Sequence, residues 1–360
     1  MLTWLASADR EDLVGSYLRS HFAAFVSLAA LVVWFDHPVL AQEEPLRYFP
    51  EDSVWFEDVS STPLDSQSVE IIAWLEDAGG WGNGNRLQID FSIEVLTAGA
   101  SVPFLSFFPT GDHFLPDCDL DSVPVPPNGA LEGEEGYECT TDGDCHLIVV
   151  HESSERLYEM WRANIVGGTF YGGCLAVWDL SASYGPSGRG EQCTSADAAG
   201  LPIAQLLFSA DEVASGAIRH AIRFILPNSR IRHRAYLHPA THSTGATGGS
   251  LEAPPYGARL RLRTDFPLGS LPNEGARVVA RAMQRYGMIL ADAGQIALTA
   301  ESDRFTNANW DGLLGPHDLV GIEVSDFQVV EGGERFEWTG DCVRSPNAPR
   351  RLRIVNPEQP

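Results

Sequence analysis

The sequence predicts a mainly β protein, a β-sandwich or jelly roll with one or two helices, carried behind an export signal. Three observations indicate this fold class. Residues 87–95 (LQIDFSIEV) alternate between apolar and polar side chains, which is typical of a half-buried strand. The chain contains 17 Phe, nine Trp and nine Tyr, residues that suit sheets. Helical spacing is convincing in one segment alone, residues 273–286.

Residues 1–41 are expected to form a signal peptide. Residues 22–35 are apolar except for Ser27, and this run is shorter than the roughly 20 residues that span a bilayer. Val39 and Ala41 supply the small side chains that signal peptidase needs, so cleavage is expected after Ala41. The basic character before the apolar run is weak, which leaves an uncleaved anchor as the alternative.

The exported part is expected to be one β-rich domain, residues 42–345, followed by a short tail, residues 346–360. No segment rich in Pro, Gly or Ser divides it into two domains. The helix predicted over 273–286 has Gly287 placed to end it, and a helical turn is expected near 211–213. Further strands are expected at 146–150, 173–180, 217–226, 257–264, 288–292 and 321–330.

The six cysteines all follow the signal segment, and an even number in an exported protein predicts disulfides. Short spacing favours Cys139–Cys145 and Cys174–Cys193, which leaves Cys118–Cys342. A zinc site is the alternative, but no CxxC pair is present. The acidic segments 117–121 and 142–145 resemble fragments of calcium loops without the required glycine and glutamate. We therefore expect no metal and no cofactor.

The net charge is −25, and all 24 basic residues are arginine. Such a negative surface repels nucleic acids and anionic membranes, so neither is an expected partner. Residues 217–285 differ from the rest of the chain, because they carry 11 Arg and three acidic residues.

Arginines share one face of each of two predicted strands in this segment. If the strands are neighbours, a cationic strip results that suits the carboxylates of an acidic glycan. The alternative is that these arginines pair with the protein's own carboxylates. The strip would consist of Arg219, Arg223, Arg259, Arg261 and Arg263.

Three histidines are candidates for a site. Alternation places His220 on the apolar face of its strand, where it is either a core histidine or a partly desolvated acid or base. Its expected partner is Asp197, His242 or Tyr286. His238 and His242 lie in a loop, where they would line the mouth of a pocket rather than bind a metal ion.

Asp197, Glu212 and Asp292 are the carboxylates expected to supply a paired acid and base, although each alone is also suited to a turn or a helix cap. Tyr286 and His220 are the candidates to remove a proton if the reaction is a lyase reaction. The chain has no GxSxG, HExxH or P-loop motif, which removes the main support for serine esterases, zinc proteases and nucleotide enzymes.

Several segments together resemble a family of secreted bacterial proteins that share the motifs ADAAGLP, GxIxHAIRF and YGMILAD. The likeness covers residues 140–331, and in this chain Ala293 and Gly294 stand where the family has an Asn-Gly turn. The resemblance implies secretion and carries no reaction with it. The matching segments are CTSADAAGLPI, DEVASGAIRHAIRF, HPATHS, PPYGARLRLR, RYGMILAD and DFQVVE.

We therefore expect a secreted carbohydrate-active enzyme, extracellular or periplasmic, that acts on an extracellular polysaccharide as a hydrolase or a lyase, with an acidic polysaccharide as one candidate substrate. Its cleft would combine the sheet face of His220 with loops bearing His242, Asp197 and Asp292. The alternative is a non-catalytic carbohydrate-binding or cell-surface module. A purely structural envelope protein is the third hypothesis.

Overall fold

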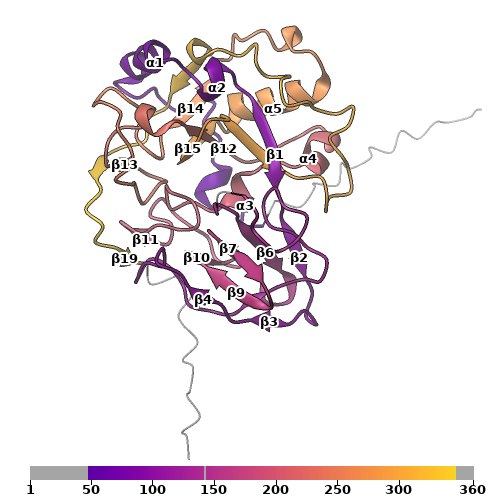
Figure 1. Cartoon of the computed structure of the whole chain (residues 1–360). Helices are drawn as coiled ribbons and strands as arrows, with labels where there is room; N and C mark the ends of the chain where they lie inside the picture. The colour runs from indigo at the N-terminus through magenta and orange to yellow at the C-terminus, as the bar shows by residue number, and fades with distance from the viewer. Residues whose placement is uncertain (1–47, 142, 346–360) are drawn as a thin grey trace, which may run out of the picture. The chain divides into compact units, whose positions relative to one another are not determined.

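A six-stranded mixed sheet is the largest element of the computed structural model, which describes residues 48–141 and 143–345 (Figure 1). β12 lies parallel to β15, and β1 lies parallel to β16. The other pairs in this sheet are antiparallel. In spatial order the strands are β1 (Ile89–Ile93), β16 (Leu298–Glu301), β12 (Ile222–Leu226), β15 (Met288–Ala293), β14 (Arg259–Leu262) and β17 (Phe327–Val329).

A four-stranded sheet is buried on both faces. Because neighbouring side chains of a strand point to opposite faces, Ile148 and Trp178 join the main core while Val149 and Val177 join a second apolar cluster. The second cluster is completed by residues of short strands, among them Val123 and Phe170, and by Phe107 between two of them. In spatial order the sheet consists of β10 (Leu175–Asp179), β7 (Arg156–Met160), β6 (Leu147–His151) and β2 (Leu96–Ala98).

Short ladders complete the strand content. They tie loops to one another, and some of their side chains, such as that of Phe170, also join the second apolar cluster. The pairs are β3 (Phe104–Leu105) with β5 (Val123–Pro124), β11 (Gly190–Glu191) with β19 (Val343–Arg344), and β13 (Ala235–Leu237) with β18 (Arg335–Glu337). A three-stranded sheet has the order β4 (Phe108–Pro109), β9 (Thr169–Gly172) and β8 (Asn164–Val166).

The longest helix, α5 (Glu274–Arg285), begins and ends where the sequence indicates. The Asn273 side chain accepts a hydrogen bond from the Ala276 amide, and Gly287 follows the helix with φ 70°. Its apolar side chains are buried against β14. The other helices are α1 (Ser68–Asp77), α2 (Gly82–Asn85), α3 (Ile203–Leu206) and α4 (Ala210–Ser215).

Three disulfides are present, and two of them differ from the predicted pairing. Cys139–Cys145 is confirmed. The predicted Cys174–Cys193 and Cys118–Cys342 bonds are wrong, because Cys118 bonds Cys174 and Cys193 bonds Cys342. Backbone pairing explains both: the Asp119 amide donates to Leu175, which brings Cys118 beside Cys174, and the β11–β19 ladder brings Cys193 to Cys342.

The mainly β fold with few helices is confirmed. The described residues belong to one compact unit. None of the helices in the described part of the chain is both long and apolar enough to cross a bilayer. The predicted signal peptide, its cleavage point after Ala41 and the tail over 346–360 lie outside the described residues.

Candidate functional site

A cavity of about 760 Å³ lies beyond the end of β15, and loops from several parts of the chain form its walls. This volume suits a ligand the size of a small oligosaccharide. The side chains that matter for its chemistry are Asp144, His146, Trp161, Asp197, His242, Tyr256, Asp292 and Trp338.

Asp197 is held on a loop that is tied to the large sheet. The Ala199 amide donates to the Ala291 carbonyl of β15, at 2.9 Å, so the loop lies beside the end of that strand. The Ser195 hydroxyl accepts a hydrogen bond from the Asp197 amide and donates to the Leu201 carbonyl, which fixes the local turn. Asp197 therefore reaches the cavity with none of its side chain exposed to solvent.

Asp292 approaches the cavity from β15, and Arg223 joins it to Asp197. Arg223 Nη2 lies 3.3 Å from Asp197 Oδ2 and 3.7 Å from Asp292 Oδ2. Because both oxygens contact the same nitrogen atom, they can be no further apart than the sum of these two distances. This upper limit falls within the separation of roughly 5–10 Å between the two carboxyl groups of glycosidases. Arg223 Nη1 also donates to Thr299 Oγ1, at 2.7 Å, which anchors the guanidinium.

The two carboxyl groups differ in exposure. Burial raises the pKa of Asp197 well above its usual value, although Arg223 opposes the shift. Burial also raises the pKa of Asp292, again against Arg223, but 27% of this side chain is exposed. Asp197 Oδ1 is buried and has no hydrogen-bond partner among the described residues. Asp197 is therefore the carboxyl group better suited to hold a proton, and Asp292 is better suited to be ionised.

His146 is a buried cation in the wall of the cavity. Its Nδ1 lies 2.6 Å from Glu132 Oε2, and its Nε2 lies 3.1 Å from the carbonyl oxygen of Ala196. Since both oxygens are acceptors, both ring nitrogens carry protons. Burial alone lowers the pKa of His146, but the Glu132 carboxylate outweighs this and raises it to about 9.

His242 is neutral by contrast. Burial lowers its pKa, and its Nδ1 donates to the Ala198 carbonyl at 2.7 Å, so Nε2 is the acceptor. The ring packs edge-on against Trp338, with centroids 4.9 Å apart. Trp161 and Tyr256 supply further aromatic surface to the cavity. The wall thus combines aromatic faces with titratable groups, as in carbohydrate-binding pockets.

The structure places two candidates of the sequence analysis away from the cavity. His220 is 1% exposed, and its ring nitrogens face the Ala221 carbonyl and Glu212 Oε1, at 2.8 and 3.0 Å. The expected partners of His220 are wrong, because Glu212 of α4 takes that place. Glu212 also forms a capping box with Ser209. Tyr286 lies at the end of α5, where the Arg285 guanidinium lies over its ring, 5.1 Å from the centroid.

The five arginines do not form the predicted strip, because β15 lies between β12 and β14. Arg259 and Arg261 are buried beneath the segment 54–62. Arg259 contacts Glu57 and the Val54 carbonyl, and Arg261 donates to the carbonyls of Val59, Ser60 and Thr62. Alternation predicted which face the side chains share, but it gave no indication of what covers that face.

The remaining predicted binding residues also lie outside the cavity. Arg263 is exposed and pairs with Asp265 at 2.7 Å. His238 pairs with Glu191 at 2.8 Å and packs against Phe336. Arg219 is half-buried just before β12. Of the eleven predicted site residues, Asp197, Asp292 and His242 line the cavity and Arg223 lies behind its two aspartates.

Sequence reasoning missed the residues contributed by the smaller sheet. His146 follows Cys145 at the start of β6, Trp161 follows β7, and Asp144 lies in the loop before β6. None stands in a catalytic motif, although Asp144 belongs to the calcium-like segment 142–145. A weak signal was available for Asp144 and His146 in their position beside Cys145, since disulfides often hold binding loops in place.

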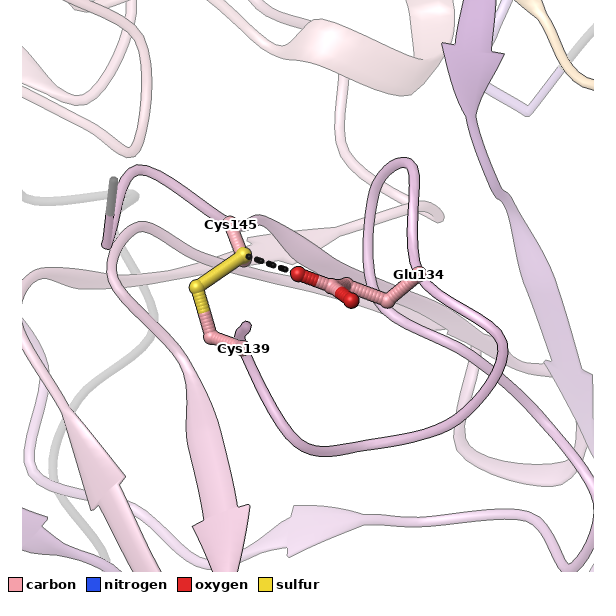
Figure 2. A group of neighbouring side chains, drawn as sticks. All are labelled: Glu134, Cys139 and Cys145. Atoms are coloured by element: carbon pink, nitrogen blue, oxygen red, sulfur yellow. Dashed lines mark hydrogen bonds between the residues drawn. A yellow bond between two sulfur atoms is a disulfide. The ribbon is translucent and has the colours of Figure 1, made fainter. Parts of the chain in front are cut away.

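A metal site is not formed by the thiols. Among the described residues, ligand atoms come close enough to hold an ion in the group Glu134, Cys139 and Cys145 (Figure 2). The two sulfur atoms are bonded to each other, so neither is a thiolate that could bind a metal. Glu134 accepts hydrogen bonds from Thr140 and Thr141, which makes this group a brace for the loop.

The calcium-like segment 117–121 is also committed to contacts within the protein. Asp117 accepts from the Thr194 amide, and Asp119 binds Arg189 and Arg344. In the second calcium-like segment, Asp142 lies outside the described residues. The chain matches no protein-family model, no curated protein and no solved structure.

Proposed function

We propose that the protein is a secreted glycoside hydrolase acting on an extracellular polysaccharide, with Asp197 as general acid and Asp292 as nucleophile or general base. The observation that carries the proposal is the pair of aspartates held by Arg223 at an aromatic cavity. Glycoside hydrolysis needs one protonated and one ionised carboxyl group flanking the bond to be cleaved. The unequal burial of Asp197 and Asp292 supplies that difference.

The reaction divides between the two side chains. Asp197 donates its proton to the glycosidic oxygen as the bond to the leaving sugar breaks. Asp292 carries the negative charge that either attacks the anomeric carbon or removes a proton from the attacking water. Arg223 orients both carboxyl groups through its contacts with their Oδ2 atoms.

Hydrolysis is favoured over the lyase reaction. A lyase of acidic glycans needs a cation that neutralises the sugar carboxylate beside the base. His220 and Tyr286, the predicted bases, lie outside the cavity, and Arg223 already contacts two carboxylates. Export to the cell surface or the periplasm is part of the proposal, and the three disulfides support it.

A non-catalytic glycan-binding module is the second candidate, because several aromatic side chains are exposed, one of them at the edge of the cavity. Phe114 borders the cavity and is 52% exposed, while Phe108 and Tyr171 of the paired strands β4 and β9 are 64% and 40% exposed. Sugars stack on such rings in binding modules and enzymes alike. Turnover distinguishes the two candidates.

The experiment measures reducing ends released from a panel of polysaccharides. We expect Asp197→Asn and Asp292→Asn each to lower kcat by a factor of about 10² or more, because each removes a proton-transfer or charged group. Asp77→Asn, an exposed aspartate at the end of α1, is the matched control. Full turnover by both cavity variants, or products with unsaturated ends that absorb in the near ultraviolet, would refute the assignment.

A further inference from the structure

The cavity lining is acidic. Four of its residues are aspartates: Asp117, Asp144, Asp197 and Asp292. The described lining contains no arginine, and the chain contains no lysine. Its basic residues are three histidines, His113, His146 and His242.

Cations beside the cavity are held by the protein's own acceptors, including Arg162, which lies over the Trp161 ring and pairs with Asp112. Arg223 contacts Asp197, Asp292 and Thr299. His146 binds Glu132 at 2.6 Å. An anionic sugar would therefore have to displace a buried ion pair, whereas a cationic sugar would meet carboxylates directly.

Asp144 and Trp161 form a composite surface on one wall. The indole Nε1 of Trp161 donates a hydrogen bond to Asp144 Oδ1, which fixes the ring beside the carboxylate. The loop carrying Asp144 is braced by the Cys139–Cys145 disulfide. An indole ring packs against the apolar face of a sugar, and a neighbouring carboxylate binds an ammonium group.

A second, independent feature is the buried oxygen of Asp197. Its Oδ1 has no hydrogen-bond partner in the described structure, although the side chain lines the cavity and none of it is exposed. A buried polar atom without a partner costs about 1–3 kcal/mol, and a ligand that forms a hydrogen bond there relieves this cost. Because Arg223 faces Oδ2, the proton of Asp197 is carried by Oδ1, and a hydroxyl or ring oxygen of a sugar can accept it.

We propose that the cavity selects a polysaccharide that carries free amino groups, a polymer containing glucosamine-type residues, rather than an acidic one. The proposal rests on the proposed function for the site, but it concerns recognition and does not need turnover. Asp144 contacts the ammonium group, and Trp161 packs against the sugar ring. The expectation of an acidic glycan is not supported by the charge of this lining.

The test is isothermal titration calorimetry of the full exported protein with three tetrasaccharides at mildly acidic pH: a glucosamine oligomer, its fully N-acetylated counterpart and a uronic acid oligomer. We expect the glucosamine oligomer to bind most tightly and to lose affinity as salt is added. We expect the uronic acid oligomer to bind least well. Equal affinity for the first two oligomers, or no binding of the glucosamine oligomer, would overturn the proposal.

A matched pair of variants locates the contact. Asp144→Asn keeps an acceptor for the Trp161 indole and removes the charge, so affinity for the glucosamine oligomer should fall about two- to fivefold, the effect of one partly exposed ion pair. Affinity for the N-acetylated oligomer should stay the same. Asp77→Asn should change neither affinity. If Asp144→Asn lowers the affinity for both oligomers equally, Asp144 does not bind the ammonium group and the proposal is wrong.

These results are separable from those on turnover. Binding of the glucosamine oligomer without release of reducing ends from any polysaccharide would overturn the hydrolase and leave the inferred selectivity standing. Hydrolysis of neutral and amino-bearing polymers at equal kcat/KM would support the hydrolase and overturn the inferred selectivity for amino groups.

Discussion

The clearest prediction concerns the pH dependence that His146 gives to stability. The His146 pKa rises from 6.5 to about 9 in the folded protein, because Glu132 outweighs the effect of burial. A rise of this size corresponds to about 3 kcal/mol of stabilisation. Since the folded pKa is the higher one, the stabilisation is complete below about pH 6.5 and is lost as pH rises through about 9.

His146→Gln keeps a donor toward Glu132 but cannot change its charge over this range. Between about pH 6.5 and 9, the free energy of unfolding of the wild type should fall by about 3 kcal/mol more than that of the variant. This corresponds to a difference of about 6 °C in Tm shift for a chain of this size. Urea unfolding and thermal scans at several pH values measure both quantities.

A second histidine variant controls for general effects of pH. His317 is exposed, and His317→Gln should follow the wild type at every pH. Glu94 and Glu159 also titrate within the range, because burial raises the pKa of each to about 7, and the comparison of slopes cancels their contribution. If wild type and His146→Gln lose stability in parallel from pH 6.5 to 9, the buried ion pair does not exist.

Three further predictions test the fold. Peptide mapping without reduction should give the three disulfides of the structure, and a peptide joining Cys174 to Cys193 would contradict them. Glu212→Ala should lower the free energy of unfolding by about 2–4 kcal/mol, since it removes a helix cap and the partner of His220. The control Glu70→Ala replaces an exposed glutamate and should change the free energy of unfolding little. Equal losses in the two variants would refute the capping and pairing role of Glu212. Arg261→Met should cost about 1–3 kcal/mol without changing glycan affinity, because three carbonyls lose their donor; weaker glycan binding at unchanged stability would restore Arg261 to a binding role.

The sequence predicted best those elements that depend on local patterns. α5 follows from apolar spacing together with Asn273 and Gly287 at its ends, and β1 follows from alternation. The strand predicted at 217–226 begins only at Ile222, because the preceding residues serve other contacts. His220 turns to Glu212, and the Ala221 amide donates to Trp55. Those contacts involve other segments, so alternation within the strand could not reveal them.

The disulfide pairing and the surroundings of the arginines could not be predicted, because both depend on segments that are far apart in the sequence. The Cys193–Cys342 bond joins residues 149 positions apart and depends on the pairing of β11 with β19. The cover over Arg261 comes from a segment about 200 residues earlier. Asp197 was accessible to sequence reasoning because it stands among small residues soon after Cys193, and Asp292 because it lies near the end of a predicted strand. His146 was not, because its role depends on Glu132 and on Ala196.

Arg223 connects the fold of the large sheet with the protonation states of the two aspartates in the cavity. One guanidinium lies near one fully buried and one partly exposed carboxyl group, so it offsets part of the desolvation cost of each and the full cost of neither. For this reason the pKa of both aspartates is raised by burial, despite Arg223, and the deeper Asp197 shifts further. The parallel pairing of β12 with β15 fixes the arginine beside Asp292, and the bond from Ala199 to Ala291 brings Asp197 to the same place. Burial of Asp197 therefore favours a proton on that carboxyl group against the opposing charge of Arg223, whereas the partial exposure of Asp292 favours its ionised form.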